Sequence, residues 1–216
     1  MQTEEIRSNI EIKELTTEDI PEIVHIHIES FPESLMTRLG AEILQKYYEW
    51  HFDESHKIVK VAGAVYDGKC IGFILTGVFN GSTSGFVRKN IWLIIKEAAV
   101  RPWLLFDKKL IKKFKSGTKI LTSTFTKKPP VNNPRVKSYG LVSLAVSPAY
   151  RKLGAGKILM EEFELIAKNC GYSRTDFTVE PTNYKAVNLY EKLGWQRTLS
   201  NGEWKGAMEK DIEDIQ

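Results

Sequence analysis

Apolar residues recur along this chain with two periodicities, one typical of strands and one of helices. The first third predicts a strand over 10–15, helices over 20–30 and 40–51, and paired strands over 57–66 and 70–79. The polar run Thr16-Thr17-Glu18-Asp19 precedes the first helix and offers side chains that cap a helix start. Between the paired strands, Asp67-Gly68-Lys69 predicts a tight hairpin turn.

The last third returns to alternating strands and helices. The expected elements are a strand over 141–146, a helix over 154–169, a strand over 175–179, a helix over 183–193, and two short strands around Trp195 and over 204–209. Strands that alternate with helices predict an α/β fold, and the hairpin adds antiparallel pairing. The sequence therefore predicts one domain over 1–216 with a mixed central sheet.

Between the third and fourth expected strands lies a segment far longer than a connection needs. Residues 82–137 form this insertion, and connections longer than about 15 residues usually carry structure or function of their own. Apolar runs predict helices within it at 91–95, 103–106 and 110–114. The run over 126–134, which holds three prolines, predicts an extended loop. The insertion is therefore expected to be partly helical.

Positive charge is concentrated in this insertion. Residues 88–137 hold fourteen lysines and arginines against Glu97 and Asp107, a net charge of +12, whereas the whole chain carries +4. A solvated basic surface is the ordinary explanation, but the aromatic and aliphatic residues among the charges favour an anionic partner. The candidates are the diphosphate of a nucleotide-linked acceptor and an anionic membrane surface. No nucleic-acid-binding module is recognisable, so nucleic acid is not an expected partner.

A helix start with two glycines follows the fourth expected strand. It reads Arg151-Lys152-Leu153-Gly154-Ala155-Gly156-Lys157. The first turn of a helix presents unpaired backbone N–H groups and a positive dipole end, where a diphosphate can bind. Glycine has no β-carbon, so a phosphate can approach closely. Glycines that only pack a helix against a strand are the simpler alternative, and Gly-x-Gly alone does not separate the two.

A second motif lies one βα unit later. The run Asn183-Tyr184-Lys185-Ala186-Val187-Asn188-Leu189-Tyr190-Glu191-Lys192-Leu193-Gly194-Trp195 predicts an amphipathic helix that ends at a glycine. Together with Arg151-x-x-Gly154-x-Gly156, this run resembles the GNAT superfamily of acyl-CoA-dependent N-acyltransferases. The resemblance covers residues 139–195 in sequence and the rest of the chain in element order only. It implies a GNAT fold, in which the mixed central sheet is splayed between the fourth and fifth strands.

The resemblance also implies a site for acetyl-CoA as cosubstrate. In GNAT enzymes the Asn of the second motif contacts the pantetheine arm and its Tyr hydroxyl lies by the thioester sulfur, and Asn183 and Tyr190 fill these positions. A backbone amide of the fourth strand, near Leu144 or Val146, would polarise the thioester carbonyl. Tyr190 would protonate the departing thiolate, against the alternative that it only packs in the core. The expected cofactor-binding residues are Leu144, Ala145, Val146, Arg151, Lys152, Leu153, Gly154, Ala155, Gly156, Lys157, Asn183 and Tyr190.

The general base is where this chain departs from the common GNAT pattern. Many members carry Glu or Asp a few residues before the Val-x-Pro of the fourth strand, and those places hold Val142 and Ser143 here. The replacement candidates are His27, whose side-chain type titrates near neutral pH, with Glu29 and Glu180. A base that acts through water, or no base, is the alternative. Neither cysteine lies in a nucleophile motif, so we expect direct attack of the amine in a ternary complex.

The remaining composition excludes several classes of protein. Two cysteines and four histidines without ligand spacing predict neither a disulfide framework nor a metal site. No run of about eighteen apolar residues predicts a membrane-spanning helix, and residues 1–7 lack the apolar core of a signal peptide. We therefore expect a metal-free cytoplasmic protein, a monomer or homodimer, with contact to the inner membrane face as an alternative.

The expected function is transfer of an acetyl group from acetyl-CoA to a primary amine of a small acceptor. A nucleotide-linked amino sugar is the specific candidate, because the stretch over 30–40 resembles acyltransferases of bacterial surface-sugar pathways. Two alternatives remain open. A non-catalytic GNAT-like module would bind acyl-CoA only, and a membrane-surface acyltransferase would use the basic insertion to reach a lipid-linked or protein acceptor.

Overall fold

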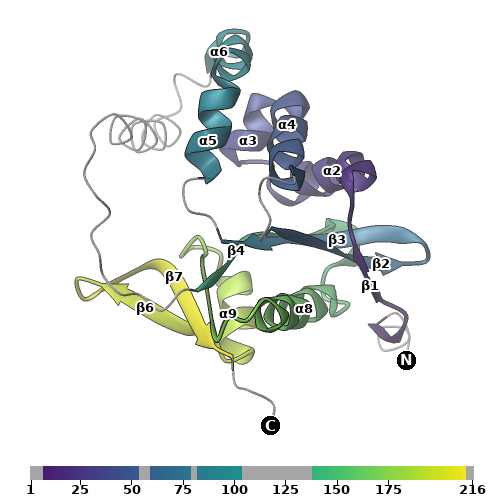
Figure 1. Cartoon of the computed structure of the whole chain (residues 1–216), viewed down its shortest axis with the longest axis vertical. Helices are drawn as coiled ribbons and strands as arrows, with labels where there is room; N and C mark the ends of the chain where they lie inside the picture. Colours follow the sequence, from purple (N-terminus) through teal and green to yellow (C-terminus); the bar gives the residue numbers. More distant parts are fainter. Residues whose placement is uncertain (1–6, 54–58, 79–81, 104–137, 213–216) are drawn as a thin grey trace.

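The computed structural model describes residues 7–53, 59–78, 82–103 and 138–212. These residues form one seven-stranded sheet with helices on both faces (Figure 1). The strands are β1 (Glu11–Glu14), β2 (Lys60–Tyr66), β3 (Lys69–Gly77), β4 (Tyr139–Val146), β5 (Arg174–Thr178), β6 (Gln196–Ser200) and β7 (Glu203–Asp211). Their spatial order is β1-β2-β3-β4-β5-β7-β6, and the predicted mixed α/β fold is confirmed.

The junction between β4 and β5 divides the sheet. Among the described strands, β4 and β5 are the pair that runs parallel. Only two residue pairs join them, Tyr139 with Thr175 and Gly140 with Asp176. From Leu141 onward, β4 stays paired with β3 while no described residue of β5 lies opposite it. The two strands therefore diverge, as the predicted splay between the fourth and fifth strands requires.

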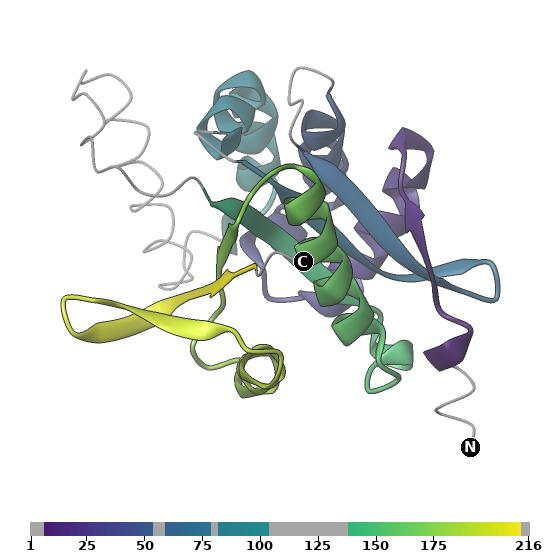
Figure 2. The same cartoon turned by 60° about the horizontal axis from the view of Figure 1, so that its bottom comes forward.

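The helices form one layer on each face of the sheet. One layer contains α2 (Ile20–Ser30), α3 (Leu35–Leu39) and α4 (Ala41–Phe52), and the other contains α8 (Ala155–Asn169) and α9 (Tyr184–Lys192). Figure 1 shows the first layer above the sheet and the second below it, and Figure 2 shows α8 lying across the sheet. Each long helix was predicted to within a few residues, whereas the short α3 was not predicted.

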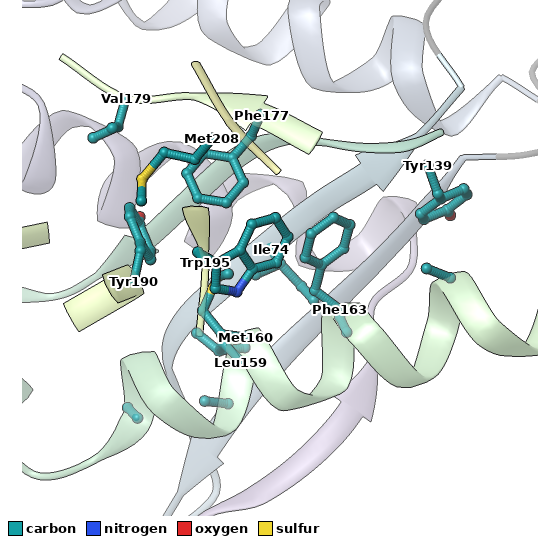
Figure 3. Close-up of a cluster of buried hydrophobic side chains, with 14 of the residues drawn as sticks. Ile74, Tyr139, Leu159, Met160, Phe163, Phe177, Val179, Tyr190, Trp195 and Met208 are labelled. Atoms are coloured by element: carbon teal, nitrogen blue, oxygen red, sulfur yellow. The ribbon is translucent and has the colours of Figure 1, made fainter. Parts of the chain in front are cut away.

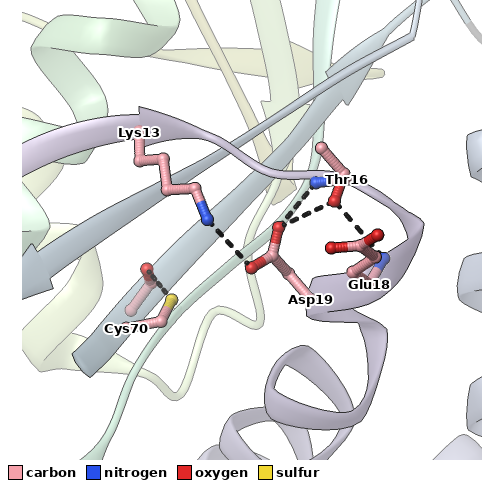
Figure 4. A network of polar contacts seen from close by, with 6 residues as sticks. Lys13, Thr16, Glu18, Asp19 and Cys70 are labelled. Carbon is pink, nitrogen blue, oxygen red and sulfur yellow. Dashed lines mark hydrogen bonds and ion pairs between the residues drawn. The ribbon is translucent and has the colours of Figure 1, made fainter. Parts of the chain in front are cut away.

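The predicted capping residues act on a 3-10 turn, Thr17–Asp19, that leads directly into α2. The Thr16 N–H donates to Asp19 Oδ2 at 2.7 Å, and the Thr16 hydroxyl accepts from the Glu18 N–H at 3.3 Å (Figure 4). Lys13 on β1 pairs with Asp19 Oδ1 at 3.2 Å. The Thr16 N–H, together with Lys13, lowers the pKa of the Asp19 carboxyl. These bonds tie β1 to the start of α2 and so fix the direction in which α2 crosses the sheet.

Apolar packing holds β4 from both faces. On the α8 face, the ring of Trp195 lies 5.7 Å from that of Phe163 and 4.6 Å from that of Phe177, between centroids (Figure 3). On the other face, Tyr48 of α4 packs edge-on against Phe73 of β3 at 5.6 Å. Both clusters also contain residues of β4. Truncating a buried aromatic ring to Ala typically costs about 3–5 kcal/mol, so these clusters fix the strand strongly.

The described part of the insertion is helical and packs on the first helical layer. α5 (Ser82–Lys89) and α6 (Ile91–Ala99) follow β3, and Phe86 and Ile94 are buried against α3 and α4. The helix predicted over 91–95 is thereby confirmed. Apart from Trp103, the helices predicted at 103–106 and 110–114 lie outside the described residues, as does the loop over 126–134.

Candidate active site

The divergence of β5 leaves one edge of β4 without a neighbouring strand. The Ser147 N–H donates to the Ile71 carbonyl at 2.9 Å, so the backbone of Ser147 faces β3. Backbone groups of successive residues in an antiparallel strand point to opposite edges. Leu144 and Val146 therefore point their N–H groups away from β3, into the gap that β5 leaves. These are the amides that the sequence analysis assigned to the thioester carbonyl.

A β-bulge precedes these two residues. Leu75 of β3 lies opposite Ser143 and Thr76 lies opposite Leu141, so Val142 is an extra residue in β4. Leu141 and Leu144 both pack into the cluster on the α8 face although they are three residues apart. The bulge thus shifts the alternation of side chains, and it directs Ser143, like Ala145, toward the face covered by α2 and α4.

The start of α8 has the geometry of a phosphate-binding turn. Gly154 has a left-handed backbone with φ of 97° and Lys152 has φ of 68°, which turn the chain into the helix. In the described chain, Lys157 and Ile158 are the first N–H donors of this helix, and both bond to the Gly154 carbonyl at 2.9 and 3.1 Å. The N–H groups of Gly154, Ala155 and Gly156 therefore precede the helical ladder and are available to an anion.

Gly156 leaves open space that the protein itself does not fill. A β-carbon placed on Gly156 would meet Leu189 Cδ2 at 3.5 Å, which is an ordinary van der Waals contact. Its φ lies outside the left-handed region, unlike that of Gly154. Neither packing nor backbone conformation requires a glycine here. The backbone at Gly156 is therefore open to close approach by a group from outside, such as a diphosphate.

Charged side chains of the helix start surround the end of β4. The Arg151 Nε donates to the Val146 carbonyl at 3.1 Å, and the same carbonyl accepts from the Ser30 hydroxyl at 3.1 Å. Lys157 pairs with Glu161 at 3.4 Å, and Lys152 is exposed. Arg151 is thus held at the end of β4.

The second motif supplies the opposite side of the gap. Asn183 caps α9 by accepting from the Ala186 N–H through Oδ1 at 3.4 Å, which leaves its amide nitrogen for another partner. Tyr190 is buried, with its ring 4.7 Å from that of Phe177, between centroids (Figure 3). Burial raises the pKa of the Tyr190 hydroxyl to about 12. Tyr190 lies on α9 and Asn183 caps its start, and α9 follows the strand that diverges from β4.

The three candidate bases occupy different environments. His27 is buried, with Nδ1 2.6 Å from the Tyr48 hydroxyl, and burial lowers its pKa to about 4. Glu29 lies at the surface beside the end of β4, where its Oε2 accepts from the Ser147 hydroxyl at 3.0 Å. Glu180 is exposed after β5, and its carbonyl accepts from the Asn183 N–H at 2.8 Å. None of the three stands on β4 itself.

Asp176 is a carboxylate that the sequence analysis did not single out. It belongs to the last pair that joins β4 and β5, and its Oδ1 lies 3.7 Å from the position of a β-carbon on Gly140. Its neighbours Thr175 and Phe177 are buried, so alternation places Asp176 on the face opposite α8. An exposed acid between two buried strand residues was the available signal. A carboxylate therefore stands where the strands separate.

Two further properties of the site bear on its chemistry. Among the described residues, no group of three or more His, Cys, Asp or Glu side chains is arranged to hold a metal ion. None of the described helices is both long and apolar enough to cross a membrane. The groups gathered around the gap are backbone amides, hydroxyls, carboxylates and basic side chains, which suit the binding of a phosphate-bearing ligand and the transfer of a proton.

A family comparison addresses the class of protein directly. Residues 117–195 match the Acetyltransferase (GNAT) family. This stretch contains β4, the glycine-bearing start of α8, β5 and α9, which are the elements that surround the gap. The match therefore falls on the part of the chain where both sequence motifs lie.

Solved structures support the same assignment at the level of the fold. The PaiA N-acetyltransferase of Thermoplasma acidophilum, in complex with coenzyme A, has a TM-score of 0.56 at 18% identity over 94% of this chain and 98% of its own. The ribosomal-protein-S18-alanine N-acetyltransferase of Escherichia coli has a TM-score of 0.56 at 16% identity, and the match covers 96% of each chain. The Salmonella typhimurium protein yncA, with acetyl-CoA, has a TM-score of 0.56 at 14% identity, and the match covers 95% of each chain. The chain has the GNAT fold, as the sequence predicted, and its residues 117–195 match the GNAT acetyltransferase family.

Proposed function

We propose that this chain is an N-acetyltransferase that moves an acetyl group from acetyl-CoA to a primary amine of a small acceptor, by direct attack in a ternary complex. One observation carries the proposal. The N–H groups of Leu144 and Val146 point into the gap beside β4, and the phosphate-binding turn at Gly154 lies at the end of the same strand. A ligand with a diphosphate at one end and a polarisable carbonyl at the other fits this arrangement.

Each part of the site has a role in this reaction. The N–H groups of 154–156, with Arg151, bind the diphosphate, and Asn183 donates its amide N–H to the pantetheine arm. The N–H of Leu144 or Val146 stabilises the negative charge that develops on the thioester oxygen when the amine attacks. Preorganised backbone donors of this kind are worth about 3–4 kcal/mol of barrier each.

Tyr190 interacts with the departing sulfur. The pKa of an ordinary thiol is about 8.5, whereas burial raises the pKa of the Tyr190 hydroxyl to about 12. The phenol is therefore the weaker acid and holds its proton against a thiolate. Its contribution is a hydrogen bond to the sulfur as negative charge develops, with final protonation of the thiolate by solvent.

A nucleotide-linked amino sugar is the acceptor that we propose within the amine class. Support comes from the +12 charge of residues 88–137, since cations favour an acceptor diphosphate. Salt screens such exposed pairs, so raising salt should increase KM for a nucleotide-linked acceptor more than for a neutral amine. Neutralising Lys108, Lys109, Lys112 and Lys113 together should have the same effect at low salt. An acceptor KM that does not change in this variant would remove the nucleotide-sugar proposal.

The experiment that tests the main proposal combines binding and turnover. Calorimetry with acetyl-CoA measures binding, and release of free thiol over a panel of primary amines measures transfer, with mass detection of the product. Binding with thiol release in the presence of one amine class supports the enzyme. Binding without release from any amine would leave the non-catalytic acyl-CoA module, and absence of binding would remove both.

A membrane-surface role is the second candidate, and one observation favours it. The outer side of α6 and the residues after it expose Trp92 at 80%, Ile95 at 50% and Trp103 at 58%, with the exposed Lys96 among them. Aromatic side chains beside basic ones are typical of surfaces that contact anionic lipid headgroups. Co-sedimentation with anionic vesicles, compared between the wild type and a Trp92→Ser/Ile95→Ser variant, tests this role.

A further inference from the structure

The last turn of α2 holds the end of β4 at two consecutive residues. The Ser30 hydroxyl donates to the Val146 carbonyl at 3.1 Å, and the Ser147 hydroxyl donates to Glu29 Oε2 at 3.0 Å. We call these two hydrogen bonds the α2 clamp. Because they join the first helical layer to the fourth strand of the sheet, they form only when the chain has folded.

The Val146 carbonyl is the point where the α2 clamp meets the phosphate-binding turn. Val146 points its N–H away from β3, and the N–H and C=O of one strand residue point to the same edge. Its carbonyl therefore opens onto the gap beside β4. Arg151 Nε, from the turn that leads into α8, donates to the same oxygen at 3.1 Å. One oxygen thus accepts from α2 and from the turn, which uses both of its lone pairs.

Ser147 is the residue at which the chain leaves the sheet. Its N–H donates to the Ile71 carbonyl of β3 at 2.9 Å, and its own carbonyl accepts from the Tyr150 N–H at 2.9 Å. The first bond extends the pairing of β4 with β3, and the second closes a short 3-10 turn on the way to α8. The α2 clamp therefore acts between the amides that face the gap and the start of α8.

The two bonds of the clamp lie in different surroundings. Ser30 is half-buried, whereas Glu29 lies at the surface, where its Oε1 is 3.4 Å from His25 Nε2. A hydrogen bond that water can replace contributes less than one that is shielded from water. We therefore expect Ser30 to contribute more than Glu29.

We propose that Ser30, supported by Glu29, is a positioning residue that sets the spacing between the carbonyl-binding amides of β4 and the phosphate-binding turn. The inference rests on the acetyl-transfer function proposed above. A cosubstrate with a diphosphate at one end and a thioester at the other must fit both places at once. A shift of about 1 Å in this spacing would misplace the thioester while the diphosphate is bound, and such a misplacement can lower the rate about 100-fold.

Two acetyl donors separate this role from a general structural one. Acetyl-CoA reaches both places, whereas acetylpantetheine carries the same thioester arm without the diphosphate. The truncated donor does not depend on where the turn lies relative to β4. Loss of the α2 clamp should therefore affect acetyl-CoA and spare acetylpantetheine. A defect in folding, in the amides of β4 or in acceptor binding would affect both donors equally.

The test measures kcat/KM for both donors, with the full chain and the fastest amine of the panel. Ser30→Ala should lower kcat/KM for acetyl-CoA at least about fivefold and that for acetylpantetheine less than about twofold. Ser30→Thr retains a hydroxyl and should restore most of the activity with acetyl-CoA. Ser200→Ala, at the exposed end of β6, is the matched control and should leave both values unchanged.

Binding gives the same comparison without turnover. In calorimetry, Ser30→Ala should bind acetyl-CoA at least about threefold more weakly than the wild type does. Its affinity for 3′-phospho-ADP should be unchanged, because this fragment occupies the turn alone. If acetylpantetheine turns over too slowly to measure, this comparison decides the question. Equal losses of affinity for the two ligands would overturn the positioning role.

Glu29 is also a candidate base, and its variants separate the two roles. Glu29→Gln keeps an oxygen that can accept from Ser147, whereas Glu29→Ala removes it. As part of the α2 clamp, Glu29→Gln should lose less activity than Glu29→Ala, and with acetyl-CoA only. A base would be lost equally in both variants and with both donors, and that result would overturn the supporting role of Glu29.

The outcomes distinguish the positioning role from the activity on which it rests. If the wild type turns over and Ser30→Ala is equally active, or loses the same factor with both donors, the positioning role alone is overturned. If Ser30→Ala fails to fold, Glu29→Ala at the surface decides the question with the same two donors. A wild type that releases no thiol from acetyl-CoA with any amine overturns the acetyl-transfer proposal, and the positioning role with it.

Discussion

The side chain of Arg7 lies against Gly154 at the start of α8. Its Cδ is 3.0 Å and its Nε 3.3 Å from the position that a β-carbon of Gly154 would take. The segment before β1 thereby brings a fourth cation to a helix start that already carries Arg151, Lys152 and Lys157. Like charges that gather at one helix N-terminus repel one another, and an anionic ligand would relieve that repulsion.

Replacing Arg7 with Ala should therefore weaken acetyl-CoA binding. We expect a decrease of about two- to tenfold, which is the effect of losing one exposed cation near a phosphate, and a smaller decrease at high salt. Lys69→Ala, at the distant β2–β3 turn, is the control. Calorimetry at two salt concentrations measures both variants. Equal affinities for Arg7→Ala and the wild type at low salt would contradict the expectation.

Gly156→Ala should separate binding from stability. The protein has room for the added methyl group, and Ala in the first turn of a helix is favoured over Gly by about 0.5–1 kcal/mol. The unliganded variant should therefore be as stable as the wild type or slightly more stable in denaturant unfolding. Acetyl-CoA binding should weaken at least about tenfold, or 1.4 kcal/mol, because the methyl group occupies the approach to the N–H groups of the helix start.

The larger Gly156→Val substitution extends this comparison. Its affinity for acetyl-CoA should be lower than that of Gly156→Ala, while both proteins remain folded. Wild-type affinity in either variant would show that no ligand group comes close to Gly156. A loss of stability without a loss of affinity would assign the glycine to packing.

Tyr190→Phe tests the role of one hydroxyl. The ring and its packing against Phe177 remain, so acetyl-CoA affinity and stability should change little. If the hydroxyl stabilises charge on the departing sulfur, kcat should fall by roughly 10². The decrease in kcat should be smaller for a thioester whose thiol is more acidic, because the negative charge on such a sulfur needs less stabilisation. Wild-type turnover under conditions where the chemical step is rate-limiting would return Tyr190 to a packing role.

His27 should make the fold sensitive to acid. The pKa of His27 is about 4 in the folded protein, whereas its ordinary value, which applies to the unfolded chain, is 6.5. Below pH 6.5 the unfolded chain therefore takes up a proton that the folded chain does not. This contribution to the free energy of unfolding is present above pH 6.5, is lost as pH falls toward 4, and amounts in full to about 3 kcal/mol.

Urea unfolding of His27→Gln between pH 7 and 4.5 measures this contribution. The variant should lose less stability over the interval than the wild type, whatever its stability at pH 7. His25→Gln, on the exposed side of the same helix, is the matched control and should retain the wild-type decrease. Parallel curves for His27→Gln and the wild type would mean that His27 does not cause the acid sensitivity.

The elements that sequence analysis located well are those whose ends are set by local chemistry. α2 has the predicted bounds because Thr16 and Asp19 cap the 3-10 turn that leads into it, and Pro32 disfavours a helical conformation at Phe31. The start of α8 was located because the glycine-bearing turn is a continuous motif. α3 was missed because its five residues are too few to show a periodicity. It is stabilised by the Ser34 cap and by burial of Leu39 against the insertion.

The candidate site divides in the same way. The sequence could predict roles for the amides of Leu144 and Val146 and for the residues of both motifs, because the resemblance rests on continuous local patterns; these roles stay predictions. Tyr48 gave no signal in the sequence. Its contact with His27 depends on how α2 and α4 pack together, which no local pattern encodes. Asp176 likewise acquires its place only when β5 pairs with β4.

The two residue pairs that join β4 to β5 have a consequence for amide hydrogen exchange. The amides of Ser143 and Ala145 face β3 inside the ladder and should exchange slowly, whereas those of Leu144 and Val146 open onto the gap and should exchange quickly. Four consecutive residues of one strand would then alternate in protection. A ligand that bonds to the outer edge of β4 would slow the fast pair and remove the alternation, so the exchange rates of two amides would report whether the gap is filled.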